Sequence, residues 1–344
     1  MAGRLILPTL GQMEVAEIDV QDDDLIRRFW EAGKEADEYE RPYATFWPLL
    51  SATVAFRATN NSMEQHPIAA VDNNGQVLGS NQVLLPVLDN THVAYMEILV
   101  RPAARRRGVG SALLDAGLEL ARTKSRSTVI IEVSMPLVGR SEGRDFLGRR
   151  GFTTGIVERH RVLDLPLDHD RLDALAASAA PHHADYRLQT LGDVVPDEYM
   201  EGYCALQCAF NDEAPLGDLD VEAEVWDADR VRQTEARFRQ QGRHLCSTVA
   251  FAPDGSMVAL TDMSTSESQP TIGFQGGTLV LPEHRGHRLG LAGKVANLRR
   301  FQAAFPAVRA VHSWNAEENG PMVAINDTLG FRAVERLVEM QRKL

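Results

Sequence analysis

The sequence predicts an α/β protein with a mixed sheet (an α+β arrangement within each half), and this fold is built twice by an internal duplication. Strand-like and helix-like segments alternate along the chain, and six markers recur in the same order at nearly one spacing. Gly75, Val100, Pro102, Arg105 and Gly110 recur 180 positions later, and Phe152 recurs 179 positions later. The length of 344 residues fits two domains. We expect domains at 1–165 and 185–344, joined by a Pro- and Ala-rich linker at 166–184 with one helix.

Each copy has the same expected order of elements. In the first copy these are a helix at 22–39, a strand–turn–strand at 68–85, a strand at 92–100, a helix at 111–123 and a strand at 127–134. In the second they are 196–210, 247–263, 271–280, 291–305 and 307–314. A short helix and a last strand opened by Gly-Phe complete each copy. The Asn-Gly and Asp-Gly pairs predict the hairpin turns.

Composition excludes several classes of function. The net charge of −12 and the pI of about 5.3 argue against general binding to nucleic acid or to anionic membranes. Three cysteines give no disulfide framework, and Cys204 and Cys208 are expected in a helix core. No apolar segment approaches the length of a membrane span or has the form of a signal peptide, so we expect a cytoplasmic protein.

A basic, glycine-containing loop stands between a strand and a helix in both copies, as RRRGVG at 105–110 and RGHRLG at 285–290. Backbone N–H groups of a tight turn at a helix N-terminus bind anions, and glycine permits their close approach. Neither the GxxxxGK[ST] loop of nucleotide hydrolases nor the GxGxxG dinucleotide fingerprint is present. The pattern therefore favours a phosphate compound of another kind.

The loops resemble a known family. Val100, Pro102 and the run 105–110 are similar to the R/Q-x-x-G-x-G/A loop of the GNAT superfamily of acyl-CoA N-acyltransferases, and the Gly-Phe pairs match a signature of that family. The layout resembles two tandem GNAT folds, as in mycothiol synthases and other two-domain acetyltransferases. The resemblance implies acetyl-CoA as the acyl donor and a small-molecule amine as the acceptor, which attacks the thioester directly.

The resemblance also implies which residues contact the donor. In the first copy these are Ile98, Leu99, Val100, Arg105, Arg106, Arg107, Gly108, Val109, Gly110 and Ser111. In the second they are Leu279, Val280, Arg285, Gly286, His287, Arg288, Leu289, Gly290, Asn315 and Asn319. The two asparagines are equally well explained as turn and helix-cap residues. No metal site is expected, because His284 and His287 have no third ligand nearby.

The catalytic assignments follow from where the copies depart from the family pattern. Glu97, on the strand before the first loop, is the expected general base; the second copy has Gly277 there, with Glu283 and His284 as poorly placed substitutes. The family's acidic tyrosine is replaced by Leu147 and by Asn326, which is expected to hydrogen-bond the sulfur.

Arg288 occupies a position where the family has glycine, so the second loop must have altered geometry or use the arginine side chain. A division of labour between the copies is expected, with one copy active and the other binding or structural. Three alternatives to the leading acetyltransferase interpretation stay open. They are a non-catalytic acyl-CoA-binding or regulatory protein, one active and one degenerate domain, and a tRNA-dependent transferase, which the acidic charge disfavours. The sequence leaves the acceptor and the oligomeric state open.

Overall fold

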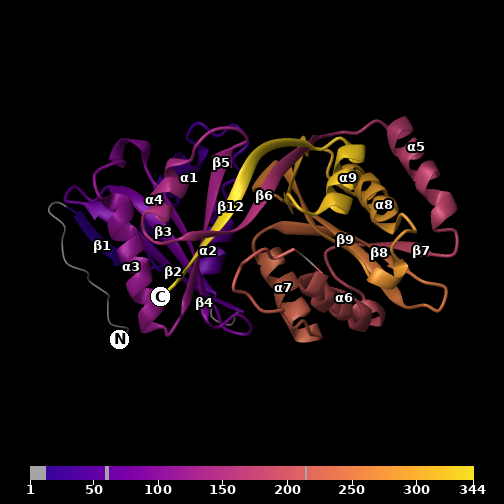
Figure 1. Cartoon of the computed structure of the whole chain (residues 1–344), viewed down its shortest axis with the longest axis horizontal. Coiled ribbons are helices and arrows are strands. Elements are labelled where there is room, and N and C mark those ends of the chain that lie inside the picture. The colour runs from indigo at the N-terminus through magenta and orange to yellow at the C-terminus, as the bar shows by residue number, and fades with distance from the viewer. Residues whose placement is uncertain (1–12, 59–61, 214) are drawn as a thin grey trace. The chain divides into compact units, whose positions relative to one another are not determined.

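The chain folds into two compact units (Figure 1); the first is mostly indigo to magenta but includes the yellow C-terminal segment, and the second is mostly magenta to yellow. The computed structural model describes residues 13–58, 62–213 and 215–344. Unit 1 comprises the described residues up to Val157 together with Leu216–Glu222 and Leu337–Leu344. Unit 2 comprises Glu158–Pro215 and Ala223–Arg336.

Unit 1 is a mixed sheet with helices on both faces. Its elements are β1 (Met13–Glu17), α1 (Asp23–Glu38), α2 (Leu49–Arg57), β2 (Met63–Asp72), β3 (Val77–Pro86), β4 (Val93–Val100), η1 (Pro102–Ala104), α3 (Val109–Thr123), β5 (Thr128–Pro136) and α4 (Glu142–Gly148). The strand order is β1-β2-β3-β4-β5-β12. Strands β1 to β4 are antiparallel to their neighbours, and β4 and β5 are parallel. The predicted Asn-Gly hairpin turn is confirmed, with Gly75 at φ 79°.

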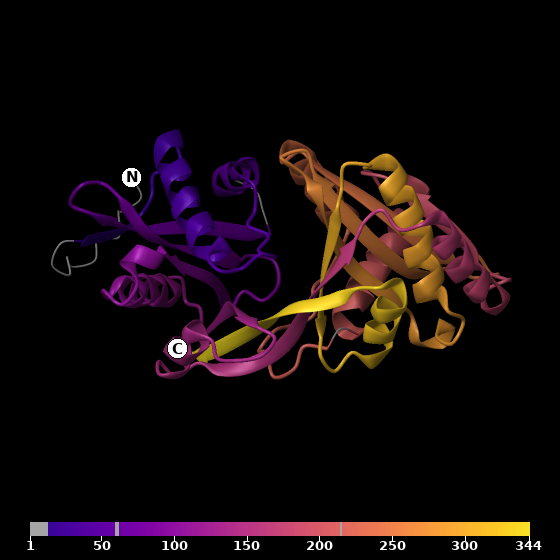
Figure 2. The same ribbon diagram turned by 90° about the horizontal axis from the view of Figure 1, so that it is seen from above.

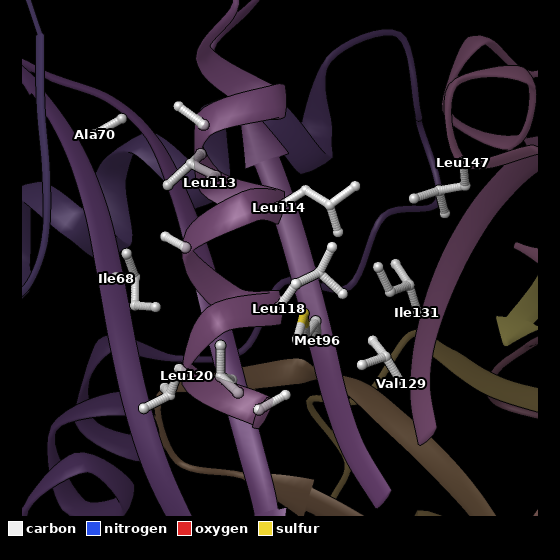
Figure 3. Close-up of a cluster of buried hydrophobic side chains, with 14 of the residues drawn as sticks. Ile68, Ala70, Met96, Leu113, Leu114, Leu118, Leu120, Val129, Ile131 and Leu147 are labelled. Atoms are coloured by element: carbon white, nitrogen blue, oxygen red, sulfur yellow. The ribbon is translucent and has the colours of Figure 1, made fainter. Parts of the chain in front are cut away.

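Alternate residues of the strands in unit 1 separate its two faces. Ile68 and Ala70 belong to the cluster around α3, whereas Ala69 belongs to the cluster around α1 and α2. Figure 3 shows the α3 side, where leucines of the helix lie over the sheet. The labelled side chains of this core are Ile68, Ala70, Met96, Leu113, Leu114, Leu118, Leu120, Val129, Ile131 and Leu147. Burial of this apolar surface is the main source of stability for the unit.

Unit 2 repeats the same architecture. Its elements are α5 (His169–Ala179), η2 (Ala180–His182), β7 (Arg187–Leu191), η3 (Asp197–Tyr199), α6 (Met200–Glu213), α7 (Ala228–Gln240), β8 (Arg243–Phe251), β9 (Met257–Ser266), β10 (Gln269–Val280), η4 (Pro282–His284), α8 (Leu289–Ala304), β11 (Ala310–Ala316) and α9 (Gly320–Leu329). The strand order is β6-β11-β10-β9-β8-β7. The predicted mixed α/β fold, present twice, is therefore confirmed.

Helices also cover both faces of the sheet in unit 2. Val311 belongs to the cluster around α8, and Leu260 to the cluster around α6 and α7. Segment 166–184 contains the expected helix, α5, whose Leu172 and Ala179 are fully buried against the α8 side. This segment is thus part of the packed unit.

The two copies exchange their last strands. The C-terminal part of β6 (Thr153–Asp164) pairs with β11 of unit 2, from Glu158 opposite Ala316 to Asp164 opposite Ala310. The C-terminal part of β12 (Arg332–Lys343), the yellow strand in Figure 2, places Val338 and Met340 in the core of unit 1. Each copy therefore supplies a strand to the unit formed mainly by the other copy.

Candidate functional site

The parallel strands β4 and β5 separate partway along their length in unit 1. Within the described residues, their pairing runs from Val93 opposite Thr128 to Met96 opposite Ile131 and stops there, although β4 continues to Val100. We call the place where the two strands separate, after Met96 and Ile131, fork 1. Beyond it, the edge of β4 that faces β5 has backbone groups that do not pair with β5. An elongated ligand that offers hydrogen-bonding groups can bind along such an edge.

Residues 101–108, which we call loop 1, connect β4 to α3. Arg106 (φ 62°) and Gly108 (φ 86°) both have left-handed backbone conformations, and α3 begins directly afterwards at Val109. The first N–H groups of a helix have no partner within it, and they carry the positive end of its dipole. Loop 1 therefore has the backbone form of an anion site, as the sequence analysis predicts.

The three arginines of loop 1 have different surroundings. Arg105 is anchored: its Nε donates to the carbonyl of Val100 at 3.1 Å, and its guanidinium lies 5.0 Å from the centre of the Tyr39 ring. Arg106 and Arg107 are exposed, and no partner of their guanidinium groups is found in the part of the chain that the structure describes. These two side chains are available to an anionic ligand.

A fourth arginine near loop 1, Arg150, was not predicted from the sequence. Arg150, which follows α4, donates from Nη2 to Ser111 Oγ at 2.5 Å in the first turn of α3 and stacks 4.2 Å from the centre of the Phe146 ring. Its Nη1 is buried and has no hydrogen-bond partner among the described residues. An unsatisfied buried guanidinium nitrogen is costly and requires an explanation, which a bound phosphate oxygen would provide.

Fork 2, in unit 2, has the same backbone course. The described pairs between β10 and β11 run from Ile272 opposite Ala310 to Phe274 opposite His312, and β10 continues to Val280. Residues 281–288, which we call loop 2, lead into α8. Here Gly286 (φ 85°) and Arg288 (φ 52°) are the left-handed residues. Arg288 therefore adopts the backbone conformation that arginine disfavours, and the loop keeps the geometry of loop 1.

The side chains of loop 2 are engaged within unit 2. Arg288 Nη1 donates to the carbonyl of Ser178 at 3.1 Å, and Nδ1 of His287 lies 3.0 Å from the carbonyl of His182. Arg285 forms an ion pair with Glu213. In loop 2, the backbone N–H groups are therefore more available to an anion than the cationic side chains are.

Glu97 lies just beyond fork 1 on the face of β4 that α1 covers, opposite Gln82 of β3. Burial raises the pKa of its carboxyl group to about 8, repulsion from Asp37 and Glu132 adds to the rise, and Arg41 opposes it. A carboxylate with a pKa near neutral pH suits the role of general base, for which the sequence analysis selected it.

Gly277 stands at the position of Glu97 in unit 2, and the space beside it is occupied. A Cβ atom on Gly277 would lie 3.0 Å from the ring of Phe210 of α6, which fills this space. Gly276 and Gly277 form an irregularity in the pairing with β9, and Asp262 lies beside it. Burial raises the pKa of Asp262 to about 6. The expected substitutes Glu283 and His284 lie on η4, where His284 Nδ1 is 3.1 Å from the hydroxyl of Tyr186.

The helix after the fork differs between the units. Leu147 of α4 is buried in the core of unit 1 near Leu114 of α3, as Figure 3 shows. In unit 2, Asn326 of α9 is fully buried and accepts a hydrogen bond from Lys294 Nζ of α8 at 2.8 Å. Asn326 also donates to Asn315 Oδ1 of β11 at 2.5 Å. Burial lowers the pKa of Lys294 to about 7.

The structure brings the predicted donor-binding residues of each copy around its fork. Ile98, Leu99 and Val100 lie on the free edge of β4, and Leu279 and Val280 on the corresponding part of β10. Val109, Gly110 and Ser111 form the first turn of α3, as Leu289 and Gly290 do in α8. Asn319 is the N-cap of α9 and accepts from Met322 N–H at 3.3 Å, so it has a structural role.

Two further properties bear on function. Within the residues that the structure describes, no group of three or more His, Cys, Asp or Glu side chains is placed to hold a metal ion. No described helix combines the length and apolarity that crossing a membrane requires.

Comparison with known proteins identifies the fold. Residues 25–152 match the model of the acetyltransferase (GNAT) family. A tandem GNAT protein from the clavulanic acid biosynthesis pathway superposes with a TM-score of 0.79 at 28% identity, covering 96% of this chain and 98% of that chain. A GCN5-related N-acetyltransferase from Sphaerobacter thermophilus gives a TM-score of 0.64 at 14% identity, covering 96% and 95%.

More distant structures share the fold alone. Saccharomyces cerevisiae N-myristoyltransferase has a TM-score of 0.58 at 12% identity, covering 98% of this chain and 81% of that chain. No match was found among curated protein sequences. The family match and the tandem neighbour support acyl-CoA N-acyltransferase activity. Residues 25–152 carry the GNAT family match, and the whole chain has the fold of a tandem GNAT protein.

Proposed function

We propose that the protein is an acetyl-CoA-dependent N-acetyltransferase of a small-molecule amine and that transfer takes place at fork 1. One observation carries the proposal. Fork 1 combines an anion-binding loop, a free strand edge and the carboxyl group of Glu97, with its raised pKa, within one stretch of β4 and α3. These are the three features that binding a thioester on a long phosphorylated arm and deprotonating an amine require.

The residues around fork 1 fit the phosphate groups of acetyl-CoA. Arg106 and Arg107 are free to bind phosphate, and the buried Nη1 of Arg150 lacks a partner among the described residues. The N–H groups of the first turn of α3 add four further donors. Acetyl-CoA, when bound, supplies an acetyl group activated as a thioester. The free N–H groups of β4 are then donors for the thioester carbonyl oxygen, whose negative charge grows during the reaction.

Glu97 accepts the proton that the amine nitrogen loses as it forms its bond to the acetyl carbon. The electron pair of the breaking carbon–sulfur bond stays with the sulfur. Leu147 has no proton to give to that sulfur, so water must protonate it.

A second function has one observation in its favour. The apolar Leu147 removes the acid expected at its position, which suits a protein that binds acyl-CoA without transferring the acyl group. Such a protein would bind acetyl-CoA and release no free thiol in the presence of amines.

Calorimetry with acetyl-CoA, followed by a thiol-release assay with a panel of small amines, separates these functions. Arg106→Glu/Arg107→Glu should weaken binding at fork 1 by at least tenfold, because two charge-assisted hydrogen bonds become repulsions. Arg122→Glu is the matched control: this exposed arginine lies at the far end of α3. Absence of acetyl-CoA binding by the wild-type protein would refute the acetyltransferase proposal, and binding without thiol release would favour the second function.

A further inference from the structure

Three ionisable side chains form a buried chain on β6, β11 and β12 in unit 2. His160 Nε2 lies 2.8 Å from His312 Nδ1, and His160 Nδ1 lies 3.3 Å from Glu335 Oε2. The exposed fractions are 1% for His160, 4% for His312 and 7% for Glu335. Burial of ionisable groups costs free energy, so packing alone does not explain why these three side chains lie here.

The hydrogen-bond pattern gives this chain a direction. An ionised Glu335 only accepts, so His160 must donate to it from Nδ1. Nε2 of His160 then carries a lone pair and must accept a hydrogen bond from Nδ1–H of His312. The remaining nitrogen of His312, Nε2, is therefore left with a lone pair that can take up a proton.

His312 lies at the point of fork 2. It is the last residue of β11 that pairs with β10, opposite Phe274. Because neighbouring Val311 points toward α8, His312 points to the opposite face of the sheet, which α6 covers. Trp314, two residues further along β11, stacks on His160 with ring centres 4.4 Å apart and planes 10° apart. An aromatic wall thus lies beside the histidine chain.

We propose that Glu335, His160 and His312 form a proton relay that serves fork 2 as a second acyl-transfer centre, with His312 as its general base. The inference rests on the proposed acetyltransferase function. His312 Nε2 accepts the proton from the amine as its nitrogen bonds to the acetyl carbon, and the electrons of the carbon–sulfur bond leave with the sulfur. His312 Nδ1–H passes its proton to His160 Nε2, and His160 passes its Nδ1 proton to Glu335.

The surroundings keep His312 in its neutral form. Burial lowers the pKa of His312 to about 4; His160 of β6 and Arg332 of β12 also lower it, and Glu335 of β12 opposes them. Phe274, the residue that faces His312 from β10, is uncharged. His312 is therefore neutral at pH 6, where Glu97, with its pKa of about 8, is almost fully protonated. Fork 2 should therefore be active already at pH 6, whereas fork 1 should become active only as the pH approaches 8.

The test measures thiol release at pH 6 and pH 9 in a Glu97→Gln background, which removes the base of fork 1. Turnover that remains at pH 6 is expected to fall by about 10²–10⁴-fold in His312→Gln, since glutamine keeps a donor toward His160 but is not a base. Added imidazole should restore part of the turnover of His312→Ala. His244→Gln is the matched control, because His244 is another carboxylate-paired histidine of unit 2, next to Asp193.

The outcomes separate the two proposals. Absence of acetyl-CoA binding by the wild-type protein defeats the proposed function and the relay with it. A wild-type protein that transfers acetyl groups, combined with a Glu97→Gln variant that is inactive at both pH values, overturns the relay alone. So does unchanged turnover in Glu97→Gln/His312→Gln. If His312→Gln lowers the melting temperature, Glu335→Gln decides: it should lower turnover, and a folded, fully active variant overturns the relay.

Discussion

Fork 1 and fork 2 have the same backbone course. In both, the parallel pairing stops partway along the strands, and the following loop has left-handed residues at equivalent places, Arg106 and Gly108 in one and Gly286 and Arg288 in the other. Glycine and arginine have exchanged positions, yet the loop conformation is the same. An anion site made of backbone N–H groups depends on this conformation and tolerates the exchange of side chains.

The side chains around the two forks have diverged. Leu114 and Leu147 in unit 1 are replaced by Lys294 and Asn326 in unit 2. Likewise, Arg150 in unit 1, whose Nη1 has no hydrogen-bond partner among the described residues, corresponds to the buried Leu329 in unit 2. The comparison teaches that the two copies share the backbone conformation of the loop, whereas the ionisable side chains around the forks differ.

The largest expected difference between the forks lies in the proposed general base, which is Glu97 at fork 1 and His312 at fork 2. In the wild-type protein, acetyl transfer should rise with pH through about 8, because Glu97 must lose its proton to act and its pKa is raised to about 8. Glu97→Gln should abolish this rise, so that the loss is large at pH 9, where Glu97 is ionised, and small at pH 6, where Glu97 is already protonated. A pH–rate profile of both proteins checks this, and equal loss at both pH values would contradict it.

Placing a lysine at position 114, where unit 2 has Lys294, tests whether the core of unit 1 tolerates a buried amine. Leu114→Lys should lower the free energy of unfolding by about 3–5 kcal/mol, because Leu147 cannot accept a hydrogen bond from the amine. Leu114→Met, which keeps the volume, should cost less than about 1.5 kcal/mol. Urea unfolding is followed by fluorescence, to which Trp30 and Trp47 of unit 1 and Trp226 and Trp314 of unit 2 contribute. Similar losses in both variants would argue against this explanation.

The reverse substitution, which replaces Lys294 and Asn326 of unit 2 by leucine, tests how stability depends on pH. The pKa of Lys294 is lowered from 10.5 to about 7 by burial, so between these values the unfolded chain binds more protons than the folded one. Stability from this group should therefore rise from pH 7 to pH 9, by roughly 1–2 kcal/mol. Lys294→Leu/Asn326→Leu, which copies the leucine pair of unit 1, should remove this rise in urea unfolding. A rise of the same size in the double variant would show that another group causes it.

The smallest expected effect concerns Arg150. Arg150→Ala should weaken acetyl-CoA binding at fork 1 by about tenfold, since one charge-assisted hydrogen bond is lost. Arg149→Ala, at the exposed neighbouring residue, provides the control and should leave the dissociation constant unchanged. Calorimetry measures both, and equal affinity in the two variants would mean that Nη1 of Arg150 does not contact the donor.

Much of the fold was predictable because its signals are local. The Asn-Gly and Asp-Gly turns, the strand before each loop and the helix after it can be recognised within a few residues, and a repeat at 180 positions makes each half evidence for the other. The loops and Glu97 were found for the same reason. Arg150 was missed because only the packing of α4 against the first turn of α3 brings it to loop 1.

The sequence by itself determined the duplicated α/β fold, the two basic loops and the positions around each fork, since short-range patterns of polarity and turn chemistry specify them. Tertiary structure alone decided the exchange of β6 and β12, and with it the contact of His160 with residues 152 and 175 positions away. It also decided that Phe210 fills the space above Gly277. The physical reason is that strand partners and buried neighbours are chosen by the packing of the whole chain, so no local pattern records them.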